Sequence, residues 1–465
     1  MAKKRLRKGI KALIIVGSVI TGLLSIVGGV YLTLQIMKDS RRNTDPEHVD
    51  PIEGGNLVFQ KNRSLYDKDG NILRLRGVNA GNVLVTEGWI APYSCGPELD
   101  DKGNIVKDSN GDIVYPDLTQ EEVEQAIATN PNLSDEQRVE LVDVYRKNWM
   151  SSDDFVRIKE EFHMNAIRLP FYWRNILDEV DGNYVRKSEE EAFGYLDWFM
   201  EQCKKNDIYC ILDLHGAVKT QNGYEHSGSE DTDMLWDNEQ AIVATCDLWA
   251  YVADHYKDSP LGEAIATYDL LNEPCGNYQG ATQDNCYPVF NRLYQAIRNT
   301  GDNHVITVEG CWSYDKFVTP KRYGWENVQY EIHLYNWPWL HTDYDAFFNG
   351  MEATRIGHDY NVPYFVGEFT FFSDDYKVWE KWLGYYDRLG YSWTLWTYKK
   401  TVTGFWNDNW GLYNYRLYLD NKKDLKVDLR TATYGELKPV LECSNTTNCY
   451  KSISGNNVSK YLAEH

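Results

Sequence analysis

The sequence predicts an α/β protein built as a (β/α)8 or TIM barrel, preceded by an N-terminal transmembrane helix. Three observations predict this: eight short apolar runs, helical patterns between most of them, and a long uncharged stretch near the N-terminus. Short apolar strands that alternate with helices are typical of a parallel sheet covered on both faces. Eight of them favour a closed barrel. A doubly wound open sheet is the rival fold, but no G-x-G-x-x-G follows the first strand.

The N-terminus has the pattern of a membrane anchor. Residues 1–11 hold six Lys or Arg, and residues 12–37 hold no charged residue. That run is too long for a typical signal-peptide core and long enough to span a bilayer. The basic cluster should stay cytoplasmic, which places the rest of the chain outside. We expect an uncleaved anchor with an extracytoplasmic domain; secretion after signal cleavage is the alternative.

The remainder divides into a polar linker, a barrel and a tail. The linker is expected over 38–56, the barrel domain over 57–442 with an acidic insertion at 93–150, and the tail over 443–465. The strands are expected at 72–79, 165–170, 208–215, 265–272, 304–309, 328–335, 362–368 and 391–398. The helices are expected at 119–129, 134–147, 152–162, 189–205, 238–256, 286–299, 343–359, 374–389 and 434–442.

Composition excludes some function classes. The chain has a formal net charge of −21, and without its basic first 45 residues the remainder reaches −28. So acidic a domain argues against nucleic-acid binding and fits a neutral substrate better than an anionic one. The 16 Trp and 34 Tyr suit a large core, although their faces also stack on sugars.

The nine cysteines form no metal-binding pattern. There is no C-x-x-C, and no histidine spacing completes a zinc site. In an extracytoplasmic domain, Cys443 with Cys449 and Cys275 with Cys286 would be candidate local disulfides. An odd count leaves at least one cysteine unpaired.

Polar residues gather where the predicted strands end. Alone, each has a structural explanation, such as a surface charge, a cap or a satisfied core histidine. Together, six strand ends are hard to explain by packing, and the carboxyl ends of barrel strands surround the active site in this fold. The residues are Arg168, His215, Asn272, Glu273, His333, Tyr335, Glu368 and Trp396.

Two of these residues, Glu273 and Glu368, form the carboxylate pair that glycoside hydrolysis needs. One carboxylic acid protonates the leaving oxygen, and the other carboxylate attacks or activates water. Arg168 would keep one of them ionised, while burial would keep the other protonated. A metal site built from the same carboxylates with His215 and His333 is the competing interpretation, which the sequence does not exclude.

At these residues the sequence resembles glycoside hydrolase family 5 over about residues 57–440. The motifs are "AIRLPFYW", "LDLHGA", "LLNEP", "EIHLYNW", "FVGEF" and "TLWTYK". The resemblance implies a TIM barrel, retention by double displacement, and no metal or organic cofactor. It implies Glu273 as acid/base and Glu368 as nucleophile, with Arg168, Asn272, His333 and Tyr335 supporting them. His215 and Trp396 would bind the −1 sugar.

Two further stretches are similar to the exo-β-1,3-glucanase branch of that family. They are "RGVNAGNVLVTEGWIAPYS" and "LDLHGAVKTQNGYEHSG", and they place Asn79 and Glu87 at sugar-contacting positions. Val218, Lys219 and Thr220 depart from the usual Pro-Gly-Ser of that branch. The expected substrate is therefore a β-glucan, β-1,3/β-1,6-linked or cellulose-like. A glycosidase acting on glycolipid headgroups and an inactive sugar-binding barrel are the alternatives.

Overall fold

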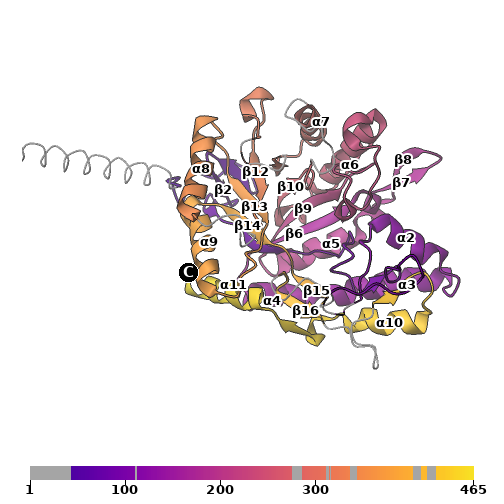
Figure 1. Ribbon diagram of the computed structural model, residues 1–465. Coiled ribbons are helices and arrows are strands. Elements are labelled where there is room, and N and C mark those ends of the chain that lie inside the picture. Colours follow the sequence, from indigo (N-terminus) through magenta and orange to yellow (C-terminus); the bar gives the residue numbers. More distant parts are fainter. Residues whose placement is uncertain are drawn as a thin grey trace, which may run out of the picture.

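The computed structural model describes residues 43–109, 111, 113–274, 285–310, 314, 316–335, 343–401, 410–415 and 426–465. Its centre is a closed barrel of eight parallel strands in which the chain runs once around and the last strand pairs with the first (Figure 1). The predicted barrel is confirmed. The strands are β4 (Arg76–Asn79), β6 (Ala166–Tyr172), β9 (Tyr209–Gly216), β10 (Ile265–Asp269), β11 (Val305–Glu309), β12 (Val328–His333), β13 (Tyr364–Glu368) and β14 (Ser392–Leu395).

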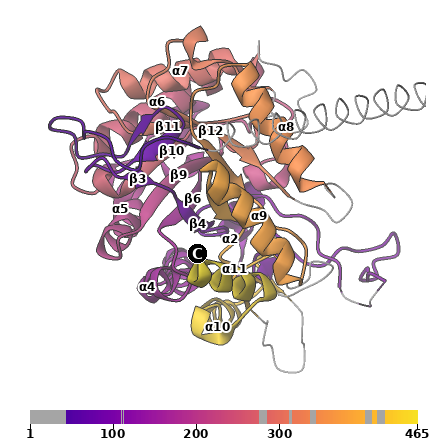
Figure 2. The ribbon, with the colours of Figure 1, turned by 90° about the vertical axis from the view of Figure 1, so that its left-hand side faces the viewer.

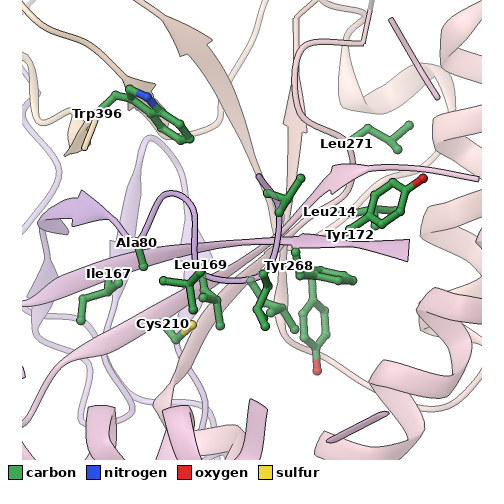
Figure 3. Close-up of a cluster of buried hydrophobic side chains, with 14 of the residues drawn as sticks. Ala80, Ile167, Leu169, Tyr172, Cys210, Leu214, Tyr268, Leu271 and Trp396 are labelled. Atoms are coloured by element: carbon green, nitrogen blue, oxygen red, sulfur yellow. The ribbon is translucent and has the colours of Figure 1, made fainter. Parts of the chain in front are cut away.

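The strands form because their residues suit a sheet that is buried on both faces. β6, β10, β11, β13 and β14 are buried at every position. Such burial explains the nearly continuous apolar runs, because neither face of a parallel sheet meets water. The apolar side chains of these strands form two hydrophobic clusters. Figure 3 shows part of the larger one, with Leu169, Tyr268 and Leu271 among its members.

Helices surround the barrel, as Figure 2 shows from a second side. The longest have start signals in the sequence: Ser188 and Glu191 make a reciprocal capping box before α5. Asn238 accepts a hydrogen bond from the backbone of α6. The outer helices are α4 (Ser152–Glu160), α5 (Glu189–Lys205), α6 (Glu239–Tyr256), α7 (Cys286–Arg298), α8 (Tyr344–Gly357) and α9 (Tyr376–Leu389).

The insertion contains α2 (Gln120–Thr129) and α3 (Asp135–Trp149) and packs against the C-terminal part of the chain. α10 (Tyr434–Cys443) lies along α3, and β5 (Tyr93–Ser94) pairs with β17 (Val427–Asp428). Lys399 of β15 (Lys399–Thr401) is fully buried, and its Nζ donates to the backbone oxygens of Trp149, 2.6 Å away, and Ser444, 2.8 Å away. This lysine joins the ends of the two helices.

Both predicted domain edges need correction. Part of the expected linker packs on the barrel domain, since Asn43 and Asp45 hydrogen-bond to Ser64 and Val49 is buried. The expected tail is also folded, because its apolar residues have a surface to cover. β18 (Cys449–Lys451) pairs with β16 (Tyr413–Tyr415), and α11 (Ile453–Glu464) packs against α9.

Small strands outside the barrel were not predicted. The first predicted strand is broken in two, because Ile72–Leu73 forms β3 of a three-stranded sheet with β1 (Phe59–Lys61) and β2 (Ser64–Tyr66). A hairpin of β7 (Leu177–Val180) and β8 (Asn183–Arg186) follows β6. The strands of this sheet and of this hairpin have only two to four residues each. Such short strands show no hydrophobic periodicity in the sequence.

The predicted transmembrane segment, residues 12–37, lies outside the described residues. No helix within the described ranges is long and apolar enough to cross a membrane. Cys443 and Cys449 are free thiols in the structure, so the disulfide predicted between them is not formed. The other predicted pair includes Cys275, which also lies outside the described residues.

Candidate active site

The site is centred on Arg168, which is fully buried in the middle of the barrel. Its guanidinium is surrounded by acids from four other barrel strands. Burial alone would lower its pKa, but these carboxylates outweigh burial and raise the pKa well above its ordinary value. Arg168 is therefore the fixed positive charge of the site. The acids are Asp213 at 3.2 Å, Asp269 at 2.8 Å, Glu331 at 3.4 Å and Glu368 at 3.1 Å.

Glu368 ends β13 and is held at both oxygens. Arg168 Nη1 donates to Oε1 at 3.1 Å, and the Tyr335 hydroxyl donates to Oε2 at 2.6 Å. Burial raises the pKa of Tyr335 well above its ordinary value, so the phenol keeps the proton that it donates. The two donors fix the position of the Glu368 carboxylate.

Glu273 follows β10 with a backbone φ of +41°, a left-handed conformation that non-glycine residues seldom adopt. The backbone here is tied to its neighbours. Asn272 N–H donates to the Leu214 carbonyl at 3.2 Å, and Glu273 N–H donates to Glu309 Oε2 at 2.5 Å. Strained backbone at a site is kept where the surroundings determine it. The turn directs the Glu273 carboxylate across the barrel mouth towards Glu368.

The two glutamates are close. An oxygen of Glu273 and an oxygen of Glu368 lie within 4.8 Å of each other, with a ring nitrogen of His333 between them. Retaining glycosidases hold their carboxyl groups about 5–5.5 Å apart and inverting ones about 6.5–9.5 Å apart. Oxygens this close fit the shorter separation better than the longer one. Distance alone would also admit a metal ion, but each of these oxygens already has a partner in the protein, and we assign none.

Two imidazoles hold the Glu273 carboxylate. His333 Nδ1 lies 2.9 Å from Oε1, and His226 Nε2 lies 3.0 Å from Oε2. Burial would raise the pKa of Glu273, but the hydrogen bonds from His226 and His333 outweigh it and lower that pKa. The structure therefore favours an ionised Glu273 beside charged imidazoles.

These groups line a cavity of about 170 Å³ at the carboxyl ends of the strands. Its walls combine titratable groups with aromatic rings, as a sugar site requires. The Trp396 ring lies parallel to the His215 ring, with centroids 5.4 Å apart. The described lining residues are Glu87, Trp89, His215, Glu225, His226, Asn272, Glu273, Tyr335, Glu368, Trp396 and Trp410. A larger, apolar cavity beside the insertion lacks a carboxylate pair.

Glu87 and His215 face each other in this cavity and have opposite shifts. Burial raises the pKa of Glu87 to about 8, so this acid is mostly protonated at neutral pH. Burial lowers the pKa of His215 well below its ordinary value, so this ring is neutral. Asp213 Oδ2 lies 2.7 Å from His215 Nδ1. On the other side of the ring, His215 Nε2 lies 3.4 Å from the Asn272 amide nitrogen. Both groups can exchange hydrogen bonds with neutral hydroxyls.

The structure brings the ten predicted site residues together around Arg168, and seven of them line the cavity. Asn79 does not line it. Its amide donates to the Gly367 carbonyl and accepts from Arg168 Nη1, so it supports Arg168 instead of meeting a sugar. Sequence reasoning missed His226 and Glu309. His226 stands inside a quoted motif, "GYEHSG", but a histidine in a loop gives no sign of its partner.

Comparisons with known proteins agree with this geometry. A family model described as cellulase (glycosyl hydrolase family 5) matches residues 128–401, more than half of the chain. The chain belongs to glycosyl hydrolase family 5. The resemblance seen in the sequence is therefore confirmed at the level of the family.

Several curated proteins are similar to the chain. Glucan 1,3-beta-glucosidase 2 of Wickerhamomyces anomalus is 29% identical over 291 residues, which are 61% of each chain. A glucan 1,3-beta-glucosidase of Pichia angusta is 30% identical over 50% of this chain and 47% of that one. A beta-xylosidase of Phanerodontia chrysosporium is 28% identical over 58% and 50%. The matches span about half to three fifths of these relatives.

Solved structures show the same fold at low identity. The structure named AoRut aligns with a TM-score of 0.55 at 15% identity, over 73% of this chain and 94% of that chain. Rutinosidase from Aspergillus niger aligns with a TM-score of 0.51 at 16% identity, over 73% and 95%. At this level of identity, the similarity shows a shared fold and nothing about function.

Proposed function

We propose that the chain is a retaining β-glycosidase that hydrolyses O-glycosidic bonds of a neutral β-glucan, anchored to a membrane by residues 12–37 with its barrel outside the cytoplasm. The observation that carries the proposal is the Glu273–Glu368 pair, whose oxygens lie within 4.8 Å across a cavity with aromatic walls. The glucan 1,3-beta-glucosidases among its relatives support the substrate class.

In the first step, Glu368 attacks the anomeric carbon while Glu273 protonates the leaving oxygen. The carbon–oxygen bond of the glycoside breaks, and a glycosyl ester on Glu368 forms. In the second step, water attacks the same carbon, Glu273 takes its proton, and Glu368 leaves as a carboxylate. Arg168 and the Tyr335 hydroxyl hold the Glu368 carboxylate in position for the attack.

The remaining groups would hold the sugar. Asn272 Oδ1 accepts from Arg168 at 2.8 Å and its amide nitrogen lies 3.4 Å from His215 Nε2, which leaves one amide N–H for a sugar 2-hydroxyl. Trp396, stacked on His215, supplies a flat apolar face, and Glu87 offers a neutral acid to sugar hydroxyls. We propose no cofactor: each step needs only proton transfer and carboxylate attack.

The test is glycan hydrolysis by the full chain in detergent, with products sized over time. The panel is β-1,3-glucan, β-1,6-glucan, carboxymethylcellulose, mixed-linkage glucan, mannan, a glucosylceramide and an aryl β-glucoside. Cleavage of a β-glucan is expected, and Glu368→Gln should abolish it while keeping the fold. Proton NMR of the first product should show the β-anomer. An α-anomer would contradict double displacement, and cleavage of the glycolipid alone would contradict the β-glucan.

A further inference from the structure

The Glu273 carboxylate raises a chemical problem for the proposed function. A general acid must carry a proton when the substrate binds. His333 Nδ1 and His226 Nε2 hold the two Glu273 oxygens at 2.9 and 3.0 Å. Two charged imidazoles stabilise the carboxylate and disfavour the carboxylic acid. The proton for the leaving oxygen therefore has to come from a neighbour that can release it.

His333 is surrounded by acids that keep it charged. Its Nε2 lies 3.2 Å from Glu331 and 3.7 Å from Glu309, and its Nδ1 lies 3.6 Å from Glu368. Burial lowers its pKa, but these carboxylates and the bond to Glu273 raise the pKa well above its ordinary value. Loss of this proton would leave four acids around a neutral ring. These carboxylates therefore favour the charged form of His333.

His226 has partners for both of its states. Its Nε2 lies 3.0 Å from Glu273 Oε2, an acceptor for the charged ring, and 3.1 Å from Asn222 Nδ2, a donor for the neutral ring. The orientation of the Asn222 amide is fixed, because Oδ1 accepts from Tyr224 N–H and Nδ2 donates to the Glu273 carbonyl. A nitrogen with an acceptor and a donor in reach can lose and regain its proton without losing a hydrogen bond.

The loop that carries His226 is held against Glu273. Gln221 donates to the Asn272 carbonyl at 2.8 Å, and Asn222 donates to the Glu273 carbonyl at 3.1 Å. The His226 side chain is 19% exposed and lines the cavity. It is therefore fixed relative to Glu273 and faces the same cavity.

We propose that His226 and Glu273 act as a single acid that shares one proton, which His226 stores on Nε2 and Glu273 delivers. This inference rests on the proposed function. As the glycosidic bond breaks, the proton moves from His226 to Glu273 and on to the leaving oxygen, which leaves a neutral ring beside a carboxylate. In the second step Glu273 takes a proton from the attacking water and returns it to His226. One water is consumed, and the pair is restored.

The surroundings of His226 set the pH range of the pair. Burial lowers the pKa of His226, but the hydrogen bond to Glu273 and the charges of Glu273, Glu87 and Glu225 raise it to about 9. The His215 ring, 6.1 Å away, is neutral. The shared proton is thus retained below about pH 9, and its apparent pKa belongs to the pair.

The test is the pH profile of kcat/KM for the full chain and for His226→Gln. Glutamine can still donate a hydrogen bond to Glu273, but it has no proton that titrates in this pH range. The substrates are a β-glucan oligosaccharide and an aryl β-glucoside with a strongly acidic phenol, whose departure needs no acid. His255→Gln is the control, because His255 contacts Asp197 on the outer helices.

We expect the alkaline limb for the oligosaccharide to fall near pH 9 in the wild type and at least two pH units lower in His226→Gln, which is a loss of about tenfold or more at pH 8. The aryl glucoside and His255→Gln should show no shift. An unmoved limb in an active His226→Gln enzyme would overturn the inference alone. A wild type inactive on both substrates would overturn the proposed function and this inference together. If the glutamine variant does not fold, His226→Asn serves the same test.

Discussion

Tyr335→Phe should slow the second chemical step much more than the first. The hydroxyl donates to Glu368 Oε2 at 2.6 Å, and a hydrogen bond to a charged group contributes about 1.5–3 kcal/mol. The first step consumes the Glu368 charge, so losing the donor costs it little. The second step regenerates that charge, so its barrier rises by the full amount, which is about 10- to 100-fold in rate.

The assay is rapid mixing with an aryl β-glucoside of good leaving group, followed by release of the phenol. We expect a burst of one phenol per enzyme, followed by a steady rate about 10- to 100-fold below that of the wild type. The value of kcat/KM should stay within a few-fold of the wild-type value. Tyr376→Phe is the matched control, because its hydroxyl donates to Glu464 between α9 and α11. Equal losses in kcat and kcat/KM with no burst would refute the reasoning.

Three further outcomes follow from buried charges and from the proposed chemistry. Arg168→Met should lower the free energy of unfolding in urea by about 3–5 kcal/mol, because it leaves buried acids uncompensated. Lys68→Met, which breaks a surface pair with Asp69, is the control and should leave the midpoint of urea unfolding unchanged. Equal effects of the two substitutions would contradict the burial argument. Burial lowers the pKa of Lys426 to about 7, below its unfolded value, so this residue's contribution to stability should rise by about 2 kcal/mol between pH 7 and 9. Glu87 and His226, whose pKa values are raised, act in the opposite direction, so the quantity to measure is the stability of the wild type minus that of Lys426→Met. A difference that does not change between pH 7 and 9 would contradict the shift of Lys426. EDTA should leave glycosidase activity unchanged, whereas a loss restored by a divalent ion would show that a metal occupies the carboxylate cluster.

The barrel could be predicted because each strand carries its own evidence. A parallel strand buried on both faces must be apolar over its length, and the runs at 265–272 and 362–368 show this without any knowledge of their neighbours. The polar residue that ends each run then marks the mouth of the barrel, which is how Glu273 and Glu368 could be paired before their distance was known.

The remainder depends on contacts that no local pattern encodes. Glu309 ends a strand like the other site residues, but only the fold shows that it accepts the backbone N–H of Glu273. Asn79 shows the converse: it sits in a suggestive motif, yet three-dimensional packing directs its amide to Arg168. The proton partner of Glu273 lies 47 residues earlier in the chain, and no spacing rule connects His226 to it.

The contacts that C-terminal residues make with much earlier parts of the chain have a consequence for biosynthesis. The Lys426 ammonium donates to the carbonyl of Gly88, which was added to the chain 338 residues earlier, and Lys399 joins helix ends that are made at very different times. During translation the loop that carries Glu87 and Trp89 is therefore made long before Lys426, which contacts it in the folded protein. Ribosome-bound chains that stop before residue 426 should contain most of the barrel yet lack a fixed rim, so sugar binding should begin only when the last elements have been released.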